Sequence, residues 1–429
     1  MYIGKYTKIS RKVQGGAIYY AIFIGFVVCL ISVLFLFTAQ VHNQYSDYFI
    51  GQDKMKDNVQ SALNRVLVHP ELALFDKKET LDVFNDGKDS VTVLKTRWGC
   101  FIIWEITSTW NKEQYTKHFM TGVNFQKGEP LALYLIEKDN YLSVSGSTTI
   151  KGNVYLPKLG VRKAYIEGSG TSLEQMVDGE KYRSGRRLPK PDSLFIHYLS
   201  IWLNGKLNDS ANIVRYEHAL KEGFIQNPFS KNTLILYSEN EILIDDGLIL
   251  DGNIIIYSPK RITIQSKAKL NTILLFSPVI KVSDGFEGSI QLFANDSMII
   301  GKGSRIKYPG YVGLLNEAYN NCFFKIEKSA TIEGGIFAWQ KHKAIQEPYI
   351  LIDKGTSITG QVFCSGNIEL KGVVNGCIYC NGFKLSTPSS LYENHLLDAI
   401  INVKAIPQNF AGYDATLKIN KQRLIQCLD

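Results

Sequence analysis

The pattern of apolar and polar residues divides the chain into an apolar N-terminal segment, a strand-rich middle segment and a repetitive C-terminal part. Residues 17–39 form an almost unbroken apolar run, long enough as a helix (~1.5 Å per residue) to cross a membrane core of ~30 Å. After Gln52, apolar residues recur at helical spacing on one face as far as Val66, and Pro70 ends the pattern. We therefore predict one helix over residues 17–69, apolar in its first half and amphipathic in its second.

Residues 70–142 are expected to form a small strand-rich module. Turn residues at 85–87 and 127–128 separate its predicted strands. The strands are segments rich in β-branched and aromatic residues, at 90–95, 100–109, 117–125 and 131–136. This composition favours an α+β or all-β module that joins the N-terminal helix to the C-terminal part.

From Thr233 onward the sequence repeats itself at intervals of 16 to 26 residues, with one interval of 45. The repeats are LILYS (234–238), IIIYS (254–258), ILLFS (273–277), IQLFA (290–294), GIFAW (335–339), QVFCS (361–365) and CIYCN (377–381). The long interval is best explained by two coils, one with an insertion. Variable spacing with aligned apolar columns is typical of a parallel β-helix, in which equivalent residues of successive coils lie ~4.8 Å apart. We therefore predict a mainly β protein with a right-handed parallel β-helix over 143–386, interrupted by a helical insertion at about 158–232.

The first strand of each coil has two apolar columns, which predicts a sheet buried on both sides. One column holds Tyr237, Tyr257, Phe276, Phe293, Ala338, Cys364 and Cys380. The other holds Leu236, Ile256, Leu275, Leu292, Phe337, Phe363 and Tyr379. We expect this second column to be an interaction surface, covered by another part of the chain or by a partner subunit, because monomers rarely expose so large an apolar patch. In the second strand of most coils the middle residue is polar, which indicates one solvated face.

Three further features flank the repeats. Helical patterns at 192–207 and 211–223 are candidates to cover the apolar column. Just before them, Arg183, Arg186, Arg187 and Lys190 form a basic loop, which is either solvated or a binding site for an acidic glycan or phosphate. The segment SLYE at 390–393 matches a capping box and predicts a helix through Ile401. Residues 387–429 are therefore expected to form a helical cap over the open end of the β-helix.

The chain offers little sign of catalytic chemistry. Its formal charge of +8, scattered over 429 residues, does not predict nucleic-acid binding. Glycosidases and lyases need converging carboxylates, whereas the turn aspartates here fall in different registers and are expected to bond to the backbone. These residues are Asp245, Asp246, Asp251 and Asp284. The sequence therefore predicts no enzyme, no metal and no cofactor.

The cysteines are also expected to be structural. Cys377 and Cys380 form a solitary pair with no second pair and no spaced histidines, which argues against a zinc site. Cys364 and Cys380 occupy one column in adjacent coils and are expected to be buried there as free thiols.

The N-terminal segment resembles that of type IV pilins and pseudopilins, on a basic leader, Gly15-Gly16 and a membrane helix that runs into an amphipathic half. In those families a peptidase cuts after the leader glycine, which implies cleavage here between Gly16 and Ala17. The fifth mature position, usually Glu in those families, is Ala21. An uncleaved signal anchor with a juxtamembrane helix explains the same pattern. In both cases, four basic residues and no acid in the leader at 1–16 predict a cytoplasmic N-terminus.

The glycine-punctuated segments 360–376 and 149–154 resemble bactofilins, the polymer-forming β-helical cytoskeletal proteins of bacteria. The resemblance covers about a third of the chain and implies architecture more than function. Bactofilin ends polymerise, whereas a helical cap would block one end here.

These observations predict a non-enzymatic scaffold or assembly subunit, anchored in a bacterial inner membrane, that presents a rigid β-helix in the periplasm. The first alternative is a pilin-like minor subunit of a type IV pilus or type II secretion-like machine, processed after Gly16. The second alternative is a polysaccharide-binding or polysaccharide-lyase β-helix. The expected partners are the membrane and other protein subunits or copies of this chain, with a glycan under the second alternative and no nucleic acid.

Overall fold

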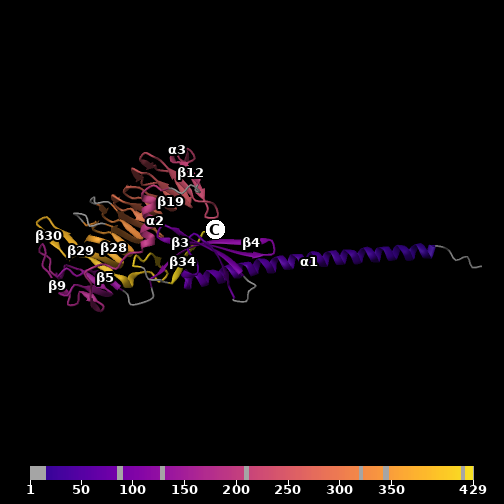
Figure 1. The fold of residues 1–429 in the computed structure, drawn as a ribbon, viewed down its shortest axis with the longest axis horizontal. Helices are drawn as coiled ribbons and strands as arrows, with labels where there is room; N and C mark the ends of the chain where they lie inside the picture. Colours follow the sequence, from indigo (N-terminus) through magenta and orange to yellow (C-terminus); the bar gives the residue numbers. More distant parts are fainter. Residues whose placement is uncertain are drawn as a thin grey trace, which may run out of the picture.

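The computed structural model describes residues 16–84, 90–125, 131–206, 212–317, 322–341, 347–416 and 421–428. Figure 1 shows three parts arranged along the long axis of the molecule: a protruding helix, an antiparallel sheet at its inner end, and a parallel β-helix beyond the sheet. The fold is therefore mainly β with one long N-terminal helix, as predicted. The leader at 1–15 lies outside the described residues.

Helix α1 (Gly16–Val68) changes character along its length. None of its residues from Gly16 to Ile50 is buried, and this half projects away from the other elements (Figure 1). It is long and apolar enough to cross a membrane. From Gly51 onward one face is buried against the antiparallel sheet, through residues such as Met55 and Leu63. The predicted two-part helix is confirmed.

The middle module is an antiparallel sheet with the strand order β1-β2-β3-β4. Its strands are β1 (Lys78–Asp82), β2 (Ser90–Trp98), β3 (Phe101–Trp110) and β4 (Glu113–Asn124), preceded by the short 3-10 helix η1 (Pro70–Leu72). Two strands from the C-terminal end of the chain, β33 (Ala411–Gly412) and β34 (Gln422–Cys427), complete the sheet by pairing with β4. The C-terminal segment therefore belongs to this sheet, and the whole β-helix is inserted between β4 and β33.

The β-helix contains a long run of coils from residue 212 to 386. Its strands are β12 (Asn212–Arg215), β13 (Phe224–Asn227), β14 (Leu234–Tyr237), β15 (Ile242–Ile244), β16 (Ile249–Gly252), β17 (Ile254–Tyr257), β18 (Arg261–Ile264), β19 (Lys269–Phe276), β20 (Val279–Val282), β21 (Glu287–Ala294), β22 (Ser297–Ile300), β23 (Arg305–Ile306), β24 (Tyr311–Asn316), β25 (Phe323–Ile326), β26 (Thr331–Gln340), β27 (Tyr349–Ile352), β28 (Ser357–Leu370) and β29 (Val373–Ser386). Tyr257, Phe276 and Phe293 pair in parallel register across β17, β19 and β21, which confirms the predicted stacking.

Each coil places a segment on each of three parallel faces. Face 1 contains β14, β17 and the second half of β19. Face 2 contains β15, β18 and β20, and face 3 contains β13, β16 and the first half of β19. Apolar side chains from all three faces fill one continuous interior, which no single coil could bury alone.

A shorter run of coils precedes the long one in the sequence but follows it in space. Its strands are β5 (Leu131–Leu135), β6 (Leu142–Ser145), β7 (Thr149–Lys151), β8 (Asn153–Leu156), β9 (Val161–Lys163), β10 (Val177–Asp178) and β11 (Lys181–Arg183). On face 1, β5 pairs with β29 on one side and with β8 on the other. On face 3, β32 (Ile400–Asn402) likewise pairs with β29 and β7. One coil is thus assembled from two segments that lie far apart in the sequence.

The predicted helical cap at 387–429 is wrong. Residues 391–402 form strands β30 (Leu391–Glu393), β31 (His395–Leu397) and β32, followed by the 3-10 helix η2 (Val403–Ala405). The edge of β29 is occupied by β5 and β32, whose backbone groups satisfy those of β29. Because further coils follow β29 in space, this end of the long run is not exposed and needs no helical cap.

The interruption of the β-helix is also shorter than predicted, because β9 to β13 lie within the expected insertion at 158–232. The helical pattern at 192–207 is confirmed as α2 (Ser193–Leu203), capped by Asp192. The pattern at 211–223 is wrong: it contains strand β12 and only the four-residue helix α3 (Tyr216–Ala219). Parallel pairing of β12 with β14 outweighs the local helical preference.

Candidate interaction surfaces

The predicted interaction column combines residues from both sides of face 1. Its first four members lie in the interior of the β-helix: Leu236, Ile256, Leu275 and Leu292. Its last three lie on the outer side: Phe337, Phe363 and Tyr379. The register explains this, since Phe293 pairs with Gly313 and Gly313 pairs with Phe337. Strand β24 lies within the 45-residue interval and has Gly313 where the neighbouring coils have an aromatic residue. The repeats after it were therefore aligned one residue out of register, which exchanged their inner and outer residues.

The outer column of face 1 is a ladder of aromatic rings. In the long run it contains Tyr237, Tyr257, Phe276, Phe293, Phe337, Phe363 and Tyr379. The short run extends it with Tyr134, Tyr155 and Tyr182. Neighbouring rings stack, with centroids 5.1 Å apart for Phe276 and Phe293 and 5.8 Å apart for Tyr379 and Tyr134. We refer to these residues as the aromatic ladder.

Other parts of the chain cover the middle of the aromatic ladder. From α2, Trp202 stacks on Phe276 at 5.3 Å between ring centroids, and Phe195 lies 5.5 Å from Phe337 in an edge-to-face arrangement. Trp98 and Phe101 of the antiparallel sheet join the same buried cluster. Over the middle of the aromatic ladder the expected cover is therefore intramolecular.

Two glutamines on the outer side of face 1 hold the antiparallel sheet and its C-terminal extension in place. The Gln291 side chain accepts a 2.7 Å hydrogen bond from the backbone N–H of Cys100 and donates a 3.0 Å bond to the carbonyl of Trp98. Gln361 likewise accepts a 2.8 Å bond from the N–H of Ala415. Both side chains are almost fully buried. In the repeat IQLFA, Gln291 stands at the second position, where the other six repeats have Ile, Leu or Val, and this polar residue is a signal from which a specific contact could have been predicted.

Buried charges mark the junction between the antiparallel sheet and α2. The Arg97 guanidinium lies 3.4 Å from the Asp192 carboxylate, and both side chains are largely buried. Nearby, the Lys95 ammonium donates to the carbonyl of Pro70 at 2.7 Å. Burial, with a smaller contribution from Arg97, lowers the pKa of Lys95 from 10.5 to about 8. This junction is a docking contact within the chain.

The predicted basic loop lies beside the far end of the aromatic ladder. The backbone N–H of Gly185 donates a 3.1 Å hydrogen bond to the Tyr134 hydroxyl, which fixes the start of the loop. All four basic side chains are exposed: Arg183, Arg186, Arg187 and Lys190. Arg186 pairs with Asp139 at 3.0 Å in a fully solvated setting. A solvated loop accounts for this geometry, and an anionic ligand here stays a prediction.

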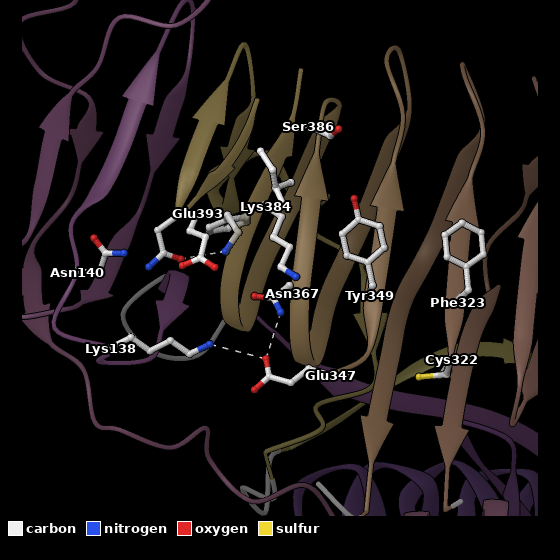
Figure 2. Close-up of a pocket in the computed structure, with 13 residues that line it drawn as sticks. Lys138, Asn140, Cys322, Phe323, Glu347, Tyr349, Asn367, Lys384, Ser386 and Glu393 are labelled. Carbon is white, nitrogen blue, oxygen red and sulfur yellow. Dashed lines mark hydrogen bonds and ion pairs between the residues drawn. The ribbon is translucent and has the colours of Figure 1, made fainter. Parts of the chain in front are cut away.

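A groove of about 700 Å³ lies on the outer side of face 2 (Figure 2). Phe323 of β25, Tyr349 of β27 and Asn367 of β28 follow one another along its floor. Hairpin strand β30 and the Lys138 segment after β5 also border it. Glu347 lies at the rim, where its carboxylate is 3.7 Å from Lys138 and accepts a 3.2 Å bond from Asn367. This groove was not predicted from the sequence.

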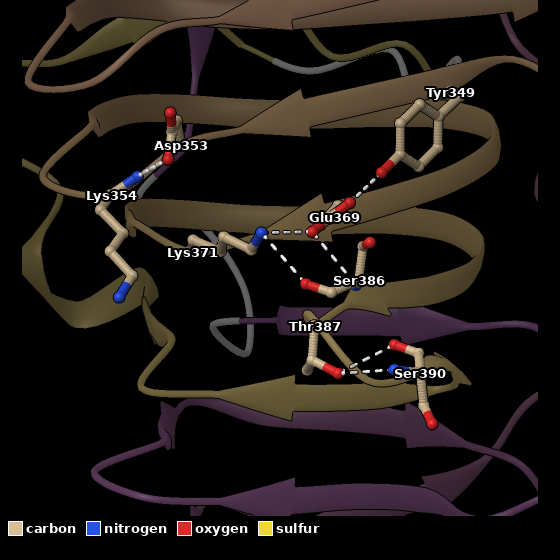
Figure 3. A network of polar contacts seen from close by, with 8 residues as sticks. All are labelled: Tyr349, Asp353, Lys354, Glu369, Lys371, Ser386, Thr387 and Ser390. Atoms are coloured by element: carbon tan, nitrogen blue, oxygen red, sulfur yellow. Dashed lines mark hydrogen bonds and ion pairs between the residues drawn. The ribbon is translucent and has the colours of Figure 1, made fainter. Parts of the chain in front are cut away.

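A buried carboxylate beneath the groove holds one of the aromatic side chains (Figure 3). The hydroxyl of Tyr349 donates to Glu369, which is only 2% exposed. Glu369 also pairs with Lys371 at 2.5 Å and accepts a 3.1 Å bond from the backbone N–H of Ser386. Burial and then the adjacent carboxylate raise the pKa of Tyr349, so this hydroxyl stays protonated. The ring of Tyr349 is therefore fixed in position.

Two of the four turn aspartates bond to the backbone as expected, whereas Asp251 in β16 accepts bonds from the side chains of Gln226 and Asn271. Asp246 accepts a 2.7 Å hydrogen bond from the backbone N–H of Lys267, and Asp284 accepts a 2.9 Å bond from that of Lys302. In both cases the bond links the turns of two coils. In the described part of the chain, no three His, Cys, Asp or Glu side chains gather as metal ligands would.

The cysteine prediction is confirmed in its geometry. Cys364 and Cys380 pair in register on adjacent coils, and both are buried free thiols. Burial raises the pKa of each thiol well above its usual range, which makes both unreactive. Gly16 and Ala17 lie exposed in the first turn of α1, and cleavage between them stays a prediction.

Comparisons with family models, curated proteins and solved structures find no match for this chain. Support for any function therefore comes from the geometry of the chain itself.

Proposed function

We propose that this protein is a membrane-anchored, non-enzymatic subunit of an extracytoplasmic assembly, which presents a β-helix at the end of a pilin-like helix. The observation that carries the proposal is the division of α1. Its first half contains the apolar run at 17–39 and has no buried residue, whereas its second half is packed under an antiparallel sheet. A helix of this kind places its first half in a lipid bilayer and holds a folded domain at the membrane surface.

The exposed apolar surface of α1 extends beyond the segment needed to cross a membrane. The apolar run at 17–39 spans ~34 Å at ~1.5 Å per residue, which already exceeds a ~30 Å hydrocarbon core. Yet Tyr48, Phe49 and Ile50 are still 50%, 63% and 58% exposed. These side chains would lie in water above the bilayer if the protein were a solitary anchor. Helices of neighbouring subunits in a bundle would bury them, which favours an assembly.

The N-terminal sequence distinguishes the pilin-like form of the proposal from an ordinary signal anchor. Mass spectrometry of the full chain extracted from its native membrane is expected to find Ala17 as the mature N-terminus. A Gly16→Leu variant should keep residues 1–16, and Gly15→Ala should still be cleaved. Intact residues 1–16 in the wild-type protein would exclude processing and leave the uncleaved scaffold.

Cysteine cross-linking tests the assembly. The exposed native thiols Cys29 and Cys427 are first replaced by serine. In that background, Tyr48→Cys should form cross-linked adducts in membranes, with a second copy or another membrane subunit identified by mass spectrometry. Lys56→Cys is the matched control, because Lys56 is an exposed polar residue of the same helix. Equal cross-linking at both positions, or none at Tyr48, would contradict a bundle at this level.

A further inference from the structure

Two aromatic rings lie next to each other in the groove on face 2. At the position where Phe323 and Tyr349 stand, the three preceding coils carry Arg261, Val279 and Ser297. Phe323 is 39% exposed. The two ring centroids lie 6.5 Å apart with only 26° between the ring planes, and Figure 2 shows the rings side by side on neighbouring strands. Two aromatic rings thus form a nearly flat apolar platform in a groove whose other lining residues are mainly polar.

The Tyr349 ring of this platform is held in place before any ligand arrives. The Tyr349 hydroxyl is bonded to buried Glu369, which is held in turn by Lys371 and the backbone of Ser386 (Figure 3). Both rings stand on strands of the β-helix and not on loops. A binding surface whose side chains are already fixed loses little conformational entropy on binding.

A nearly buried amide supplies a hydrogen-bond donor beside the platform. Asn394 lines the groove and is only 4% exposed. Its Oδ1 accepts a 3.1 Å bond from the backbone N–H of Phe383, which holds the amide at the groove wall. The Nδ2 group of the same amide is a hydrogen-bond donor that a ligand or water in the groove can use.

The charges around the groove balance. Two lysines, Lys138 and Lys384, face two glutamates, Glu347 and Glu393. An anionic or cationic ligand would meet as much repulsion as attraction, whereas a neutral ligand rich in hydroxyl groups could bond to all four. A pyranose ring has this chemistry, with an apolar C–H face and a rim of hydroxyls.

We propose that this groove binds a neutral polysaccharide, with sugar rings lying on Phe323 and Tyr349 and hydroxyl groups bonded to Asn394, Glu393 and Lys384. The volume of about 700 Å³ lies within the range of small-molecule sites, and the open groove allows a longer chain to continue past it. This inference goes beyond the proposed anchoring function and is independent of it, because the groove does not involve α1. In such an assembly the β-helix would be the part that contacts a glycan surface.

Isothermal titration of the full chain with three oligosaccharides tests the inference: a β-1,4-glucan, a β-1,4-linked N-acetylglucosamine oligomer and an α-1,4-glucan. The protein is kept in a detergent without a sugar headgroup, which could compete for the groove. At least one oligosaccharide is expected to bind, and Phe323→Ala should weaken that binding by about tenfold through loss of one stacking face. Phe224→Ala is the matched control, since Phe224 is an exposed phenylalanine on strand β13 outside the groove.

Tyr349 provides a second comparison that separates the ring from its hydroxyl. Tyr349→Phe keeps the ring and loses only the bond to Glu369, so it should bind more tightly than Tyr349→Ala. The absence of measurable binding to all three oligosaccharides at millimolar concentration would overturn the proposal. So would wild-type affinity in folded Phe323→Ala. None of these results would alter the N-terminal processing or the cross-linking of α1, so the two proposals fail separately.

Discussion

The side-chain oxygen of Gln291 accepts a 2.7 Å hydrogen bond from the backbone N–H of Cys100, although the two residues are 191 positions apart. The same side chain donates to the carbonyl of Trp98, so it closes the β2–β3 turn onto face 1. Gly99, between them, has a φ of +60°, and a Cβ there would lie 2.2 Å from the Gln291 oxygen. The Gln291 side chain can therefore bond to this turn because residue 99 is glycine.

Replacing Gln291 with leucine should destabilise the protein by about 2–4 kcal/mol, because one buried N–H and one buried C=O lose their partners. Chemical unfolding followed by tryptophan fluorescence measures the loss. Gln226→Leu is the control, since Gln226 is exposed on β13 and its side chain bonds to that of Asp251. Equal midpoints for the two variants would show that Gln291 does not hold the two parts together.

Gly51 should not tolerate alanine, although alanine favours helices by ~1 kcal/mol. A Cβ at Gly51 would lie 2.4 Å from the indole of Trp110, at the end of β3 where this strand meets α1. We expect Gly51→Ala to destabilise the contact by about 1–3 kcal/mol through overpacking, measured by thermal unfolding in detergent. Gly25→Ala in the same helix, where no atom lies within 4 Å of the added methyl group, should not lower stability.

Stability should rise with pH above pH 8 because of Lys95. Its pKa is about 8 in the folded protein and 10.5 in the unfolded chain. Below pH 8 the ammonium is charged in both states, and the free-energy cost of burying it lowers the stability of the folded state in full. Between these values the folded state releases the proton first, and the unfolded state binds more protons. The difference in unfolding free energy between wild type and Lys95→Met should shift by about 2 kcal/mol in favour of wild type from pH 7.5 to 10. A constant difference over this interval would refute the assignment.

Gly360 is required where successive coils approach each other. Its φ is +125°, and a Cβ there would lie 2.3 Å from the carbonyl oxygen of Gly334 on the preceding coil. Gly360→Ala should therefore cost about 3 kcal/mol, since neither backbone can move without disturbing the ladder. Gly303→Ala is the control: φ is +62° but no atom lies within 4 Å, so only the smaller cost of the left-handed conformation remains. Urea midpoints of the two variants give the comparison.

Much of the β-helix could be predicted from the sequence because stacking repeats the same apolar residues at the same place in each coil. The ladder from Tyr257 to Phe293 was visible for this reason. The register failed after the coil at β24, where Gly313 leaves no aromatic residue to align. Both faces of these strands are apolar, so the apolar pattern does not reveal a one-residue error in the alignment of the repeats. Such an error assigns the inward-facing residues to the outer face and the outward-facing residues to the inner face.

The C-terminal arrangement and the groove were harder to predict because they depend on contacts between distant segments. The capping-box pattern at 390–393 is a local signal, and the pairing of β32 with β29 and β7 overrides it. Phe323 and Tyr349 lie in coils whose spacing is irregular, so the sequence did not reveal that they occupy the same position in adjacent coils. Their neighbours across the groove, Lys138 and Glu393, are more than 250 residues apart in the sequence.

The coil shared by β5 and β32 also restricts the order in which the chain can acquire its structure. During synthesis, residues 131–183 emerge long before β29, so the inner edge of their coils has no neighbour until nearly the whole chain has been made. Such long-range closure is slow compared with the pairing of adjacent coils. A nascent chain that stopped before residue 373 would leave β5 as an open edge, prone to pairing with another molecule. Completion of the C-terminal end is thus the step that closes this edge inside the β-helix.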